Sequence, residues 1–142
     1  MKGKKFIFLE HTADAKFQAF GRTLEEAFEN AALALVSLMW KNGKISPEKK
    51  ISVSVSGRDL KQLLVDFLEE ILYVLDTKNF LLCRVEDILI EKEEEGFRLK
   101  SHFIGDSYSD DYHIFGEVKA ITYDEMDILE KNGFQIQVVV DI

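Results

Sequence analysis

The residues Phe134-Gln135-Ile136-Gln137-Val138-Val139-Val140-Asp141-Ile142 decide the fold of this chain. Apolar residues first alternate with glutamines and then become continuous, which is typical of a strand in the core of a sheet. The pair Asn132-Gly133 stands directly before this strand and is the strongest short signal of a β-hairpin. The strand ends on the Asp141 carboxylate, which the α-carboxylate of Ile142 follows. Two anionic groups fixed so close together repel one another unless a cation, hydrogen-bond donors or bulk water relieve them.

The rest of the chain reads as further strands and two helices. Thr23 with Glu26, and Asp59 with Gln62, have the spacing of N-terminal helix caps, and each pair precedes an apolar stripe with the period of a helix. Helices are predicted over residues 24–39 and 60–75, and strands over residues 5–9, 15–20, 51–56, 85–92, 97–104, 118–123 and 126–130. The predicted class is α+β, a two-layer αβ sandwich in which two main helices pack on a predominantly antiparallel sheet. One domain is expected over residues 1–142, with no recognisable internal repeat.

Charge and cysteine content restrict the partners and the compartment. The chain carries 18 Lys and Arg against 26 Asp and Glu, a net charge of −8. Such a chain repels nucleic-acid phosphates, so autonomous RNA or DNA binding is not expected, and a cation or a basic protein surface is the more natural partner. Its one cysteine, Cys83, excludes an intrachain disulfide and fits the reducing cytoplasm. No apolar run could span a bilayer and residues 1–5 lead into a strand, so we expect a cytoplasmic protein without a membrane partner.

The acidic residues at strand ends are the main candidates for a site. The chain has no phosphate-cradling glycine loop, no cysteine and histidine set for zinc, and no hydrolase triad. If the first and last strands are neighbours, Asp14, Asp141 and the terminal carboxylate of Ile142 converge. Three oxygen-bearing anions suit a hard divalent ion such as calcium, magnesium or manganese. Alternatively, Asp14 caps a turn and Asp141 is a solvated strand end, and the residues alone leave both interpretations open.

Other polar residues support weaker hypotheses. Asp106, Asp110 and Asp111 could form a calcium loop, but the glycine and closing glutamate of an EF-hand are missing. His11 could be a ligand or an acid–base group, or a histidine hydrogen-bonded to backbone at a turn. Lys119 stands between apolar strand positions, which is ordinary for a strand residue that points to solvent.

Four parts of the chain, in order, resemble the archease family. They are Phe8-Leu9-Glu10-His11-Thr12-Ala13-Asp14 with Gly21 and residues 24–32, then residues 64–73, residues 118–123, and the ending Val139-Val140-Asp141-Ile142. The resemblance implies a compact αβ sandwich with a divalent-ion site. The positions that match the family's site are Asp14, Asp141 and Ile142, and we expect calcium first, with magnesium or manganese as alternatives.

The resemblance also implies a function without catalysis by the chain itself. An archease-like protein activates the RtcB-type RNA ligase of tRNA splicing: it promotes guanylylation of the ligase's active-site histidine and multiple turnover. The implied partner is therefore the ligase, and tRNA is contacted only through it.

The chain departs from the family pattern at Glu10, where Asp is frequent, at Ala15, where a larger aliphatic residue is common, and at Asp124, where many relatives carry His. Two other functions stay open. One is a metal-dependent enzyme that acts on a small phosphorylated substrate with His11 as its base. The other is a chaperone-like binding module.

Overall fold

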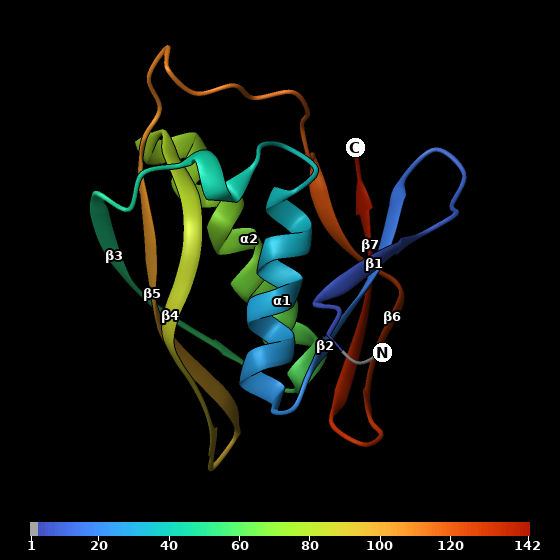
Figure 1. The fold of residues 1–142 in the computed structure, drawn as a ribbon. Coiled ribbons are helices and arrows are strands. Elements are labelled where there is room, and N and C mark those ends of the chain that lie inside the picture. The colour runs from blue at the N-terminus through green and yellow to red at the C-terminus, as the bar shows by residue number, and fades with distance from the viewer. Residues whose placement is uncertain (1–2) are drawn as a thin grey trace.

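Two helices lie between two antiparallel sheets in the computed structural model, which describes residues 3–142 (Figure 1). The strands are β1 (Phe6–Leu9), β2 (Ala15–Gly21), β3 (Lys49–Gly57), β4 (Phe80–Glu93), β5 (Gly96–Ser107), β6 (Ala120–Glu130) and β7 (Phe134–Asp141). The helices are α1 (Leu24–Val36) and α2 (Leu60–Lys78), and a short 3-10 helix, η1 (Asn42–Lys44), follows α1. Met1 and Lys2, which begin the segment expected to lead into the first strand, lie outside the described residues.

The predicted class, α+β with antiparallel strands and two helices packed on them, is confirmed. The strands form two sheets rather than one, in the orders β1-β2-β7-β6 and β3-β5-β4. The helices can serve both sheets because their apolar surface is broad: in α1 every residue from Ala31 to Val36 is buried. Four of the helix's alanines are fully buried, which lets its backbone approach its neighbours closely. The Phe67 ring of α2 packs on Phe28 of α1 and on Phe103 of β5, so the core is continuous across the layers.

Both predicted helix caps form, and they reveal a repeat that the sequence analysis did not recognise. The Thr23 hydroxyl accepts a hydrogen bond from the Glu26 backbone N–H at 3.1 Å, and the Glu26 carboxylate accepts one from the backbone N–H of Arg22. Before α2, the Asp59 carboxylate accepts from the Gln62 N–H at 2.8 Å, and the Gln62 side-chain oxygen accepts from the backbone N–H of Arg58. Each cap thus satisfies two backbone donors that the helix itself leaves unpaired.

The repeat extends from the caps to the strands. A glycine ends β2 at Gly21 and β3 at Gly57, and each is packed against the first turn of the following helix. Gly133, in the β6–β7 hairpin, lies against the carbonyl of Gly21, and Gly96, in the β4–β5 hairpin, lies against that of Gly57. One half of the repeat is β2, α1 and the β6–β7 hairpin, and the other is β3, α2 and the β4–β5 hairpin. In each half the single strand pairs with the second strand of the hairpin, and β1 is an addition to the first half.

The C-terminal strand β7 is a central strand of its sheet, as its apolar run predicts. It pairs with β2 on one side and β6 on the other, and Ile136, Val138 and Val140 face the core. The predicted hairpin at Asn132-Gly133 is confirmed, because both residues adopt the positive φ angles, 53° and 110°, that such a tight turn requires.

Several element boundaries differ from the prediction, including the ends of α2 at Lys78 and of β5 at Ser107, each three residues later than predicted. The first helix ends at Val36 rather than continuing to residue 39, and β4 begins at Phe80, five residues before the predicted start at Val85. The strands expected over residues 118–123 and 126–130 are one strand, β6, with an irregular pairing register between Thr122 and Asp127. None of the described helices meets the length and apolarity that a membrane span requires.

Candidate functional site

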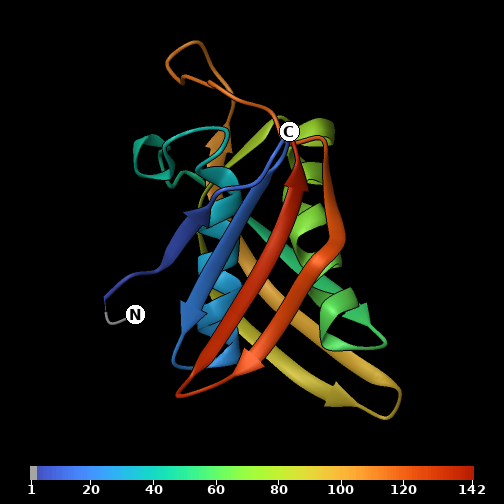
Figure 2. The ribbon, with the colours of Figure 1, turned by 90° about the vertical axis from the view of Figure 1, so that its right-hand side faces the viewer.

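Asp14 and Asp141 lie at the same end of neighbouring strands. The pairing of β2 with β7 runs from Gly21 opposite Phe134 to Ala15 opposite Val140. Asp14 directly precedes β2 and Asp141 is the last residue of β7, so both directly follow the final pair of the register and stand at the same end of the two strands. Figure 2 shows the end of β7 beside the start of β2, with the loop from β1 to β2 directly alongside. The hypothesis assumed that the first and last strands are neighbours. In the structure β1 does not pair with β7, because the second strand, β2, lies between them, and it is the start of β2 that brings Asp14 to the end of β7.

The backbone holds the end of β7 in place. Asp141 pairs with Ala120 of β6, and the Lys119 N–H donates a hydrogen bond to the Asp141 carbonyl at 2.8 Å. The Asp141 side chain itself is exposed, and Ile142 directly follows it. Whether the carboxylate of Ile142 is a ligand stays a prediction, while the position of Asp141 is fixed by Lys119 and by its pairing with β6.

A histidine between two carboxylates adjoins Asp14. His11 Nδ1 forms an ion pair with Asp14 Oδ1, and His11 Nε2 lies 2.7 Å from Glu125 Oε2. Lys16 Nζ donates to the other Glu125 oxygen at 3.0 Å. Glu125 first, and then Asp14, raise the pKa of His11, because each carboxylate favours the imidazolium form. His11, followed by Lys16, lowers the pKa of Glu125.

Glu125 is the site residue that sequence reasoning missed. It has a φ of 51° and lies where the register of β6 against β7 is irregular, which turns its side chain toward the loop that carries His11. Gln137 of β7 donates its side-chain N–H to the Glu125 carbonyl at 2.8 Å and supports this conformation. The available signal was the interruption of two strand patterns by Asp124 and Glu125, which is typical of a β-bulge.

The structure also changes the interpretation of His11. One of the interpretations that the sequence left open was a histidine hydrogen-bonded to backbone at a turn. Instead, both ring nitrogens contact carboxylates, one of them 114 residues away in the sequence. The turn is real: Ala13 has a φ of 67°, unusual for a residue with a side chain, and it directs Asp14 back toward His11.

The donors at this end fit a hard divalent cation in their chemistry. Asp14 and Asp141 offer carboxylate oxygens, the ligands that calcium, magnesium and manganese prefer. Within residues 3–142, no three His, Cys, Asp or Glu side chains are already arranged around one point as metal ligands. Two carboxylates alone make an incomplete set, so water, backbone or a partner's oxygens would have to supply the remaining ligands.

In the second acidic candidate, the group of Asp106, Asp110 and Asp111, the Asp106 carboxylate is bonded to other groups of the protein. Asp106 Oδ1 accepts from the Ser107 N–H at 2.9 Å, and Asp106 Oδ2 accepts from the Tyr112 hydroxyl at 2.7 Å. Both oxygens of Asp106 therefore stabilise the loop itself, while Asp110 and Asp111 remain exposed.

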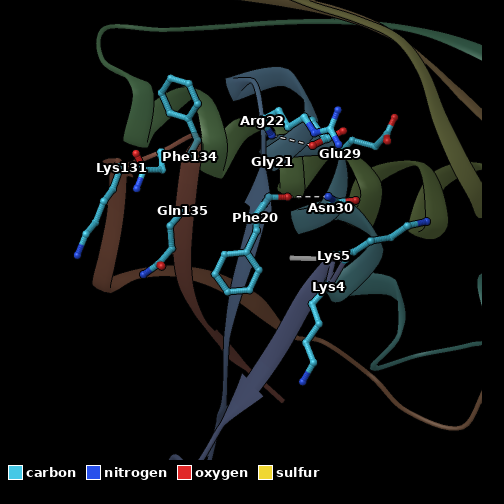
Figure 3. Close-up of a pocket in the computed structure, with 13 residues that line it drawn as sticks. Lys4, Lys5, Phe20, Gly21, Arg22, Glu29, Asn30, Lys131, Phe134 and Gln135 are labelled. Atoms are coloured by element: carbon cyan, nitrogen blue, oxygen red, sulfur yellow. Dashed lines mark hydrogen bonds between the residues drawn. The ribbon is translucent and has the colours of Figure 1, made fainter. Parts of the chain in front are cut away.

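A cavity of about 570 Å³ lies at the other end of β2, around the start of α1. Basic side chains border it, which is unusual in so acidic a chain, and inside it the Asn30 amide donates to the Phe20 carbonyl at 2.6 Å (Figure 3). The side chains of Lys4, Lys5 and Lys131 point in three different directions in Figure 3. They do not converge on one point, so we assign no anion site there.

The comparison with known proteins decides the family. Residues 6–142 match the model of the Archease protein family. This chain belongs to the archease family. The protein archease of Methanosarcina acetivorans is 46% identical over 99% of this chain and 98% of its own length, and that of Methanothermobacter thermautotrophicus is 35% identical over 100% of both. The solution structure of Methanobacterium thermoautotrophicum protein 1598 superposes with a TM-score of 0.83 at 31% identity, covering 97% of this chain and 99% of that one. Archease is therefore both the sequence family and the fold.

Neutralising the Glu125 side chain should lower the pKa of His11 in this archease. In Glu125→Gln the carboxylate that contributes most to the raised pKa of His11 is removed, so the imidazole should lose its proton at lower pH than in the wild type. A titration of the His11 ring followed by NMR measures this shift. Glu130→Gln, a change at the far end of β6, is the control and should leave the midpoint where it was. Equal midpoints in wild type and Glu125→Gln would show that the pair does not form in solution.

Proposed function

We propose that this archease activates an RtcB-type RNA ligase of tRNA splicing, promoting guanylylation of the ligase and multiple turnover. The observation that supports the proposal is the pairing of β2 with β7, which ends at Ala15 and Val140 and so leaves Asp14 and Asp141 at the same end of the two strands. These are the acidic positions that match the family pattern, and they come from opposite ends of a chain that the family model covers from residue 6 to residue 142.

The carboxylates would hold a divalent ion, calcium first, with magnesium or manganese as alternatives. Asp14 and Asp141 are the proposed ligands, with the terminal carboxylate of Ile142 as the third. A bound cation supplies the positive charge that two adjacent carboxylates lack and can interact with phosphate oxygens. The chain's own contribution is to position the pair, because β6 and β7 fix Asp141 and the His11 loop fixes Asp14.

The charge of the molecule suits this partner. An RNA ligase must present basic surface to its polyanionic substrate, whereas this archease carries a net charge of −8. Complementary charge of this kind mainly raises the association rate and orients the two proteins. The same charge opposes direct binding to RNA, so the proposal keeps tRNA in contact with the ligase alone.

The alternative with His11 as a general base loses support. A base must be unprotonated at working pH and must have a nitrogen free to accept a proton. His11 has a raised pKa and both of its ring nitrogens face carboxylates. A small-substrate hydrolase at this site would therefore need another base.

Ligation assays test the proposed role. Stoichiometric and catalytic amounts of an RtcB-type ligase, with and without this archease, separate single from multiple turnover. Asp14→Ala and Asp141→Ala are expected to lose most of the stimulation. Glu95→Ala, which removes a carboxylate from the β4–β5 bend, should keep it. Full stimulation by both Asp variants would reject the carboxylate mechanism, and no stimulation by the wild type would reject the activator role itself.

A further inference from the structure

The loop between β5 and β6, residues 108–119, presents apolar side chains to solvent. Tyr108, Ile114 and Phe115 are all exposed, with half of the Phe115 surface accessible (50%). Leaving part of an isoleucine and of a phenylalanine in water is unfavourable relative to burying them. Figure 1 shows this loop as the orange segment that arches over one end of the molecule.

The backbone of the 108–119 loop is fixed on both sides of the exposed residues. Before them, the Tyr112 hydroxyl donates to Asp106 and accepts from the Ser46 N–H at 3.1 Å. After them, the Phe115 N–H donates to the Met39 carbonyl at 2.9 Å. Gly116 is so close to the Leu38 carbonyl that a Cβ there would lie 2.2 Å from its oxygen. Ile114 and Phe115 are thus held out from an ordered support, which lowers the entropy cost of binding through them.

The loop leads directly to the carboxylate end. Its last residue, Lys119, donates its N–H to the Asp141 carbonyl at 2.8 Å, and both features lie at the same end of the molecule in Figures 1 and 2. Asp110, Asp111 and Glu117 of the loop are exposed and form no ion pair within residues 3–142. Ile114 and Phe115 therefore have exposed acidic residues on both sides of them in the loop, and the loop ends at Lys119 beside Asp141.

We propose that Ile114 and Phe115 are the hydrophobic anchor by which this archease docks on its ligase. The occupant is a protein surface with an apolar pocket bordered by basic side chains, which the acidic residues of the loop would face. Large apolar side chains at the centre of a charged rim are the usual carriers of binding energy in such interfaces. Because the anchor connects to Asp141 through Lys119, docking sets the position of the carboxylate pair on the partner. This inference rests on the proposed function.

The test separates docking from activation. The rate of ligase guanylylation is measured against archease concentration, which gives a half-maximal concentration and a maximum. Ile114→Ser combined with Phe115→Ser should raise the half-maximal concentration about tenfold or more while the maximum is retained. Asp141→Ala should lower the maximum instead. Leu89→Ser is the matched control, because Leu89 is 48% exposed on the other sheet, and it should change neither value.

Two further variants keep the test decisive if the double substitution fails to fold, which circular dichroism would show. Phe115→Leu keeps an apolar anchor and should retain most of the affinity. Asp110→Lys with Asp111→Lys reverses the charge of the loop without touching the anchor and should also raise the half-maximal concentration. Unchanged values for the serine and lysine variants, with a wild type that stimulates, would overturn the docking inference alone. A wild type without stimulation would overturn the proposed function and this inference with it.

Discussion

Replacing Phe67 with alanine is expected to lower the free energy of unfolding by about 3–5 kcal/mol. Phe67 is fully buried on α2, and its ring centroid lies 5.8 Å from that of Phe28 on α1 and 5.9 Å from that of Phe103 on β5. The side chain joins both helices to the three-stranded sheet. Its removal takes away the transfer free energy of the ring and leaves a cavity among residues that cannot all move in to fill it.

Urea unfolding followed by circular dichroism measures this loss. Leu89→Ala is the control, because its side chain is half exposed on β4, and such surface changes usually stay within about 0.5 kcal/mol. A change of less than about 1 kcal/mol for Phe67→Ala would contradict the arrangement of the two helices between two sheets. It would mean that α2 does not bury this ring between α1 and β5.

Local signals in the sequence were enough to predict the elements. The helix caps at Thr23 and Asp59, the hairpin at Asn132-Gly133 and the apolar run of residues 138–140 are each recognisable from a few adjacent residues. The physical reason is that capping and tight turns depend on short-range hydrogen bonds and on φ angles, which the residue types themselves determine.

The division into two sheets could not be predicted in the same way. Alternation along β3 shows that one face is buried, but it does not say which helix face covers it. The internal repeat was missed for a related reason, since the two halves share glycines and cap spacing rather than apolar residues. Which distant residues pack together depends on the shapes and volumes of the folded elements, and these cannot be read from one amino-acid sequence.

The site was predictable only in part, for the same reason. Asp14 and Asp141 were proposed as ligands because the sequence places both at strand ends, and the pairing of β2 with β7 brings them to the same end of the sheet. Glu125 was missed because its role depends on a bulge and on a histidine far away in the sequence. The archease resemblance supplied the proposed function, which no residue pattern in this chain would have supplied alone.

Replacing Asp141 with asparagine is expected to abolish most of the stabilisation that a divalent ion gives to this protein. An ion that binds only the folded state stabilises it by about 2.7 kcal/mol when its concentration is ~100 times the dissociation constant. The wild type should therefore unfold at a higher temperature in calcium, magnesium or manganese than in a chelator. Asp141→Asn keeps the shape of the side chain but removes one of the three proposed anionic ligands, so its unfolding temperature should depend little on the ion.

The stability of Asp141→Asn in chelator separates ion binding from a structural role of Asp141. Asp141 is exposed and lies at the same end of the paired strands as Asp14, so its charge contributes repulsion rather than stability when no cation is bound. Asp141→Asn should then be as stable as the wild type in chelator, or slightly more stable, and the order should reverse when the ion is added. Asp110→Asn tests the other acidic loop and should keep the full ion-dependent shift. An equal shift in wild type and Asp141→Asn would place the ion elsewhere, whereas loss of the shift in Asp110→Asn would place it in the 108–119 loop.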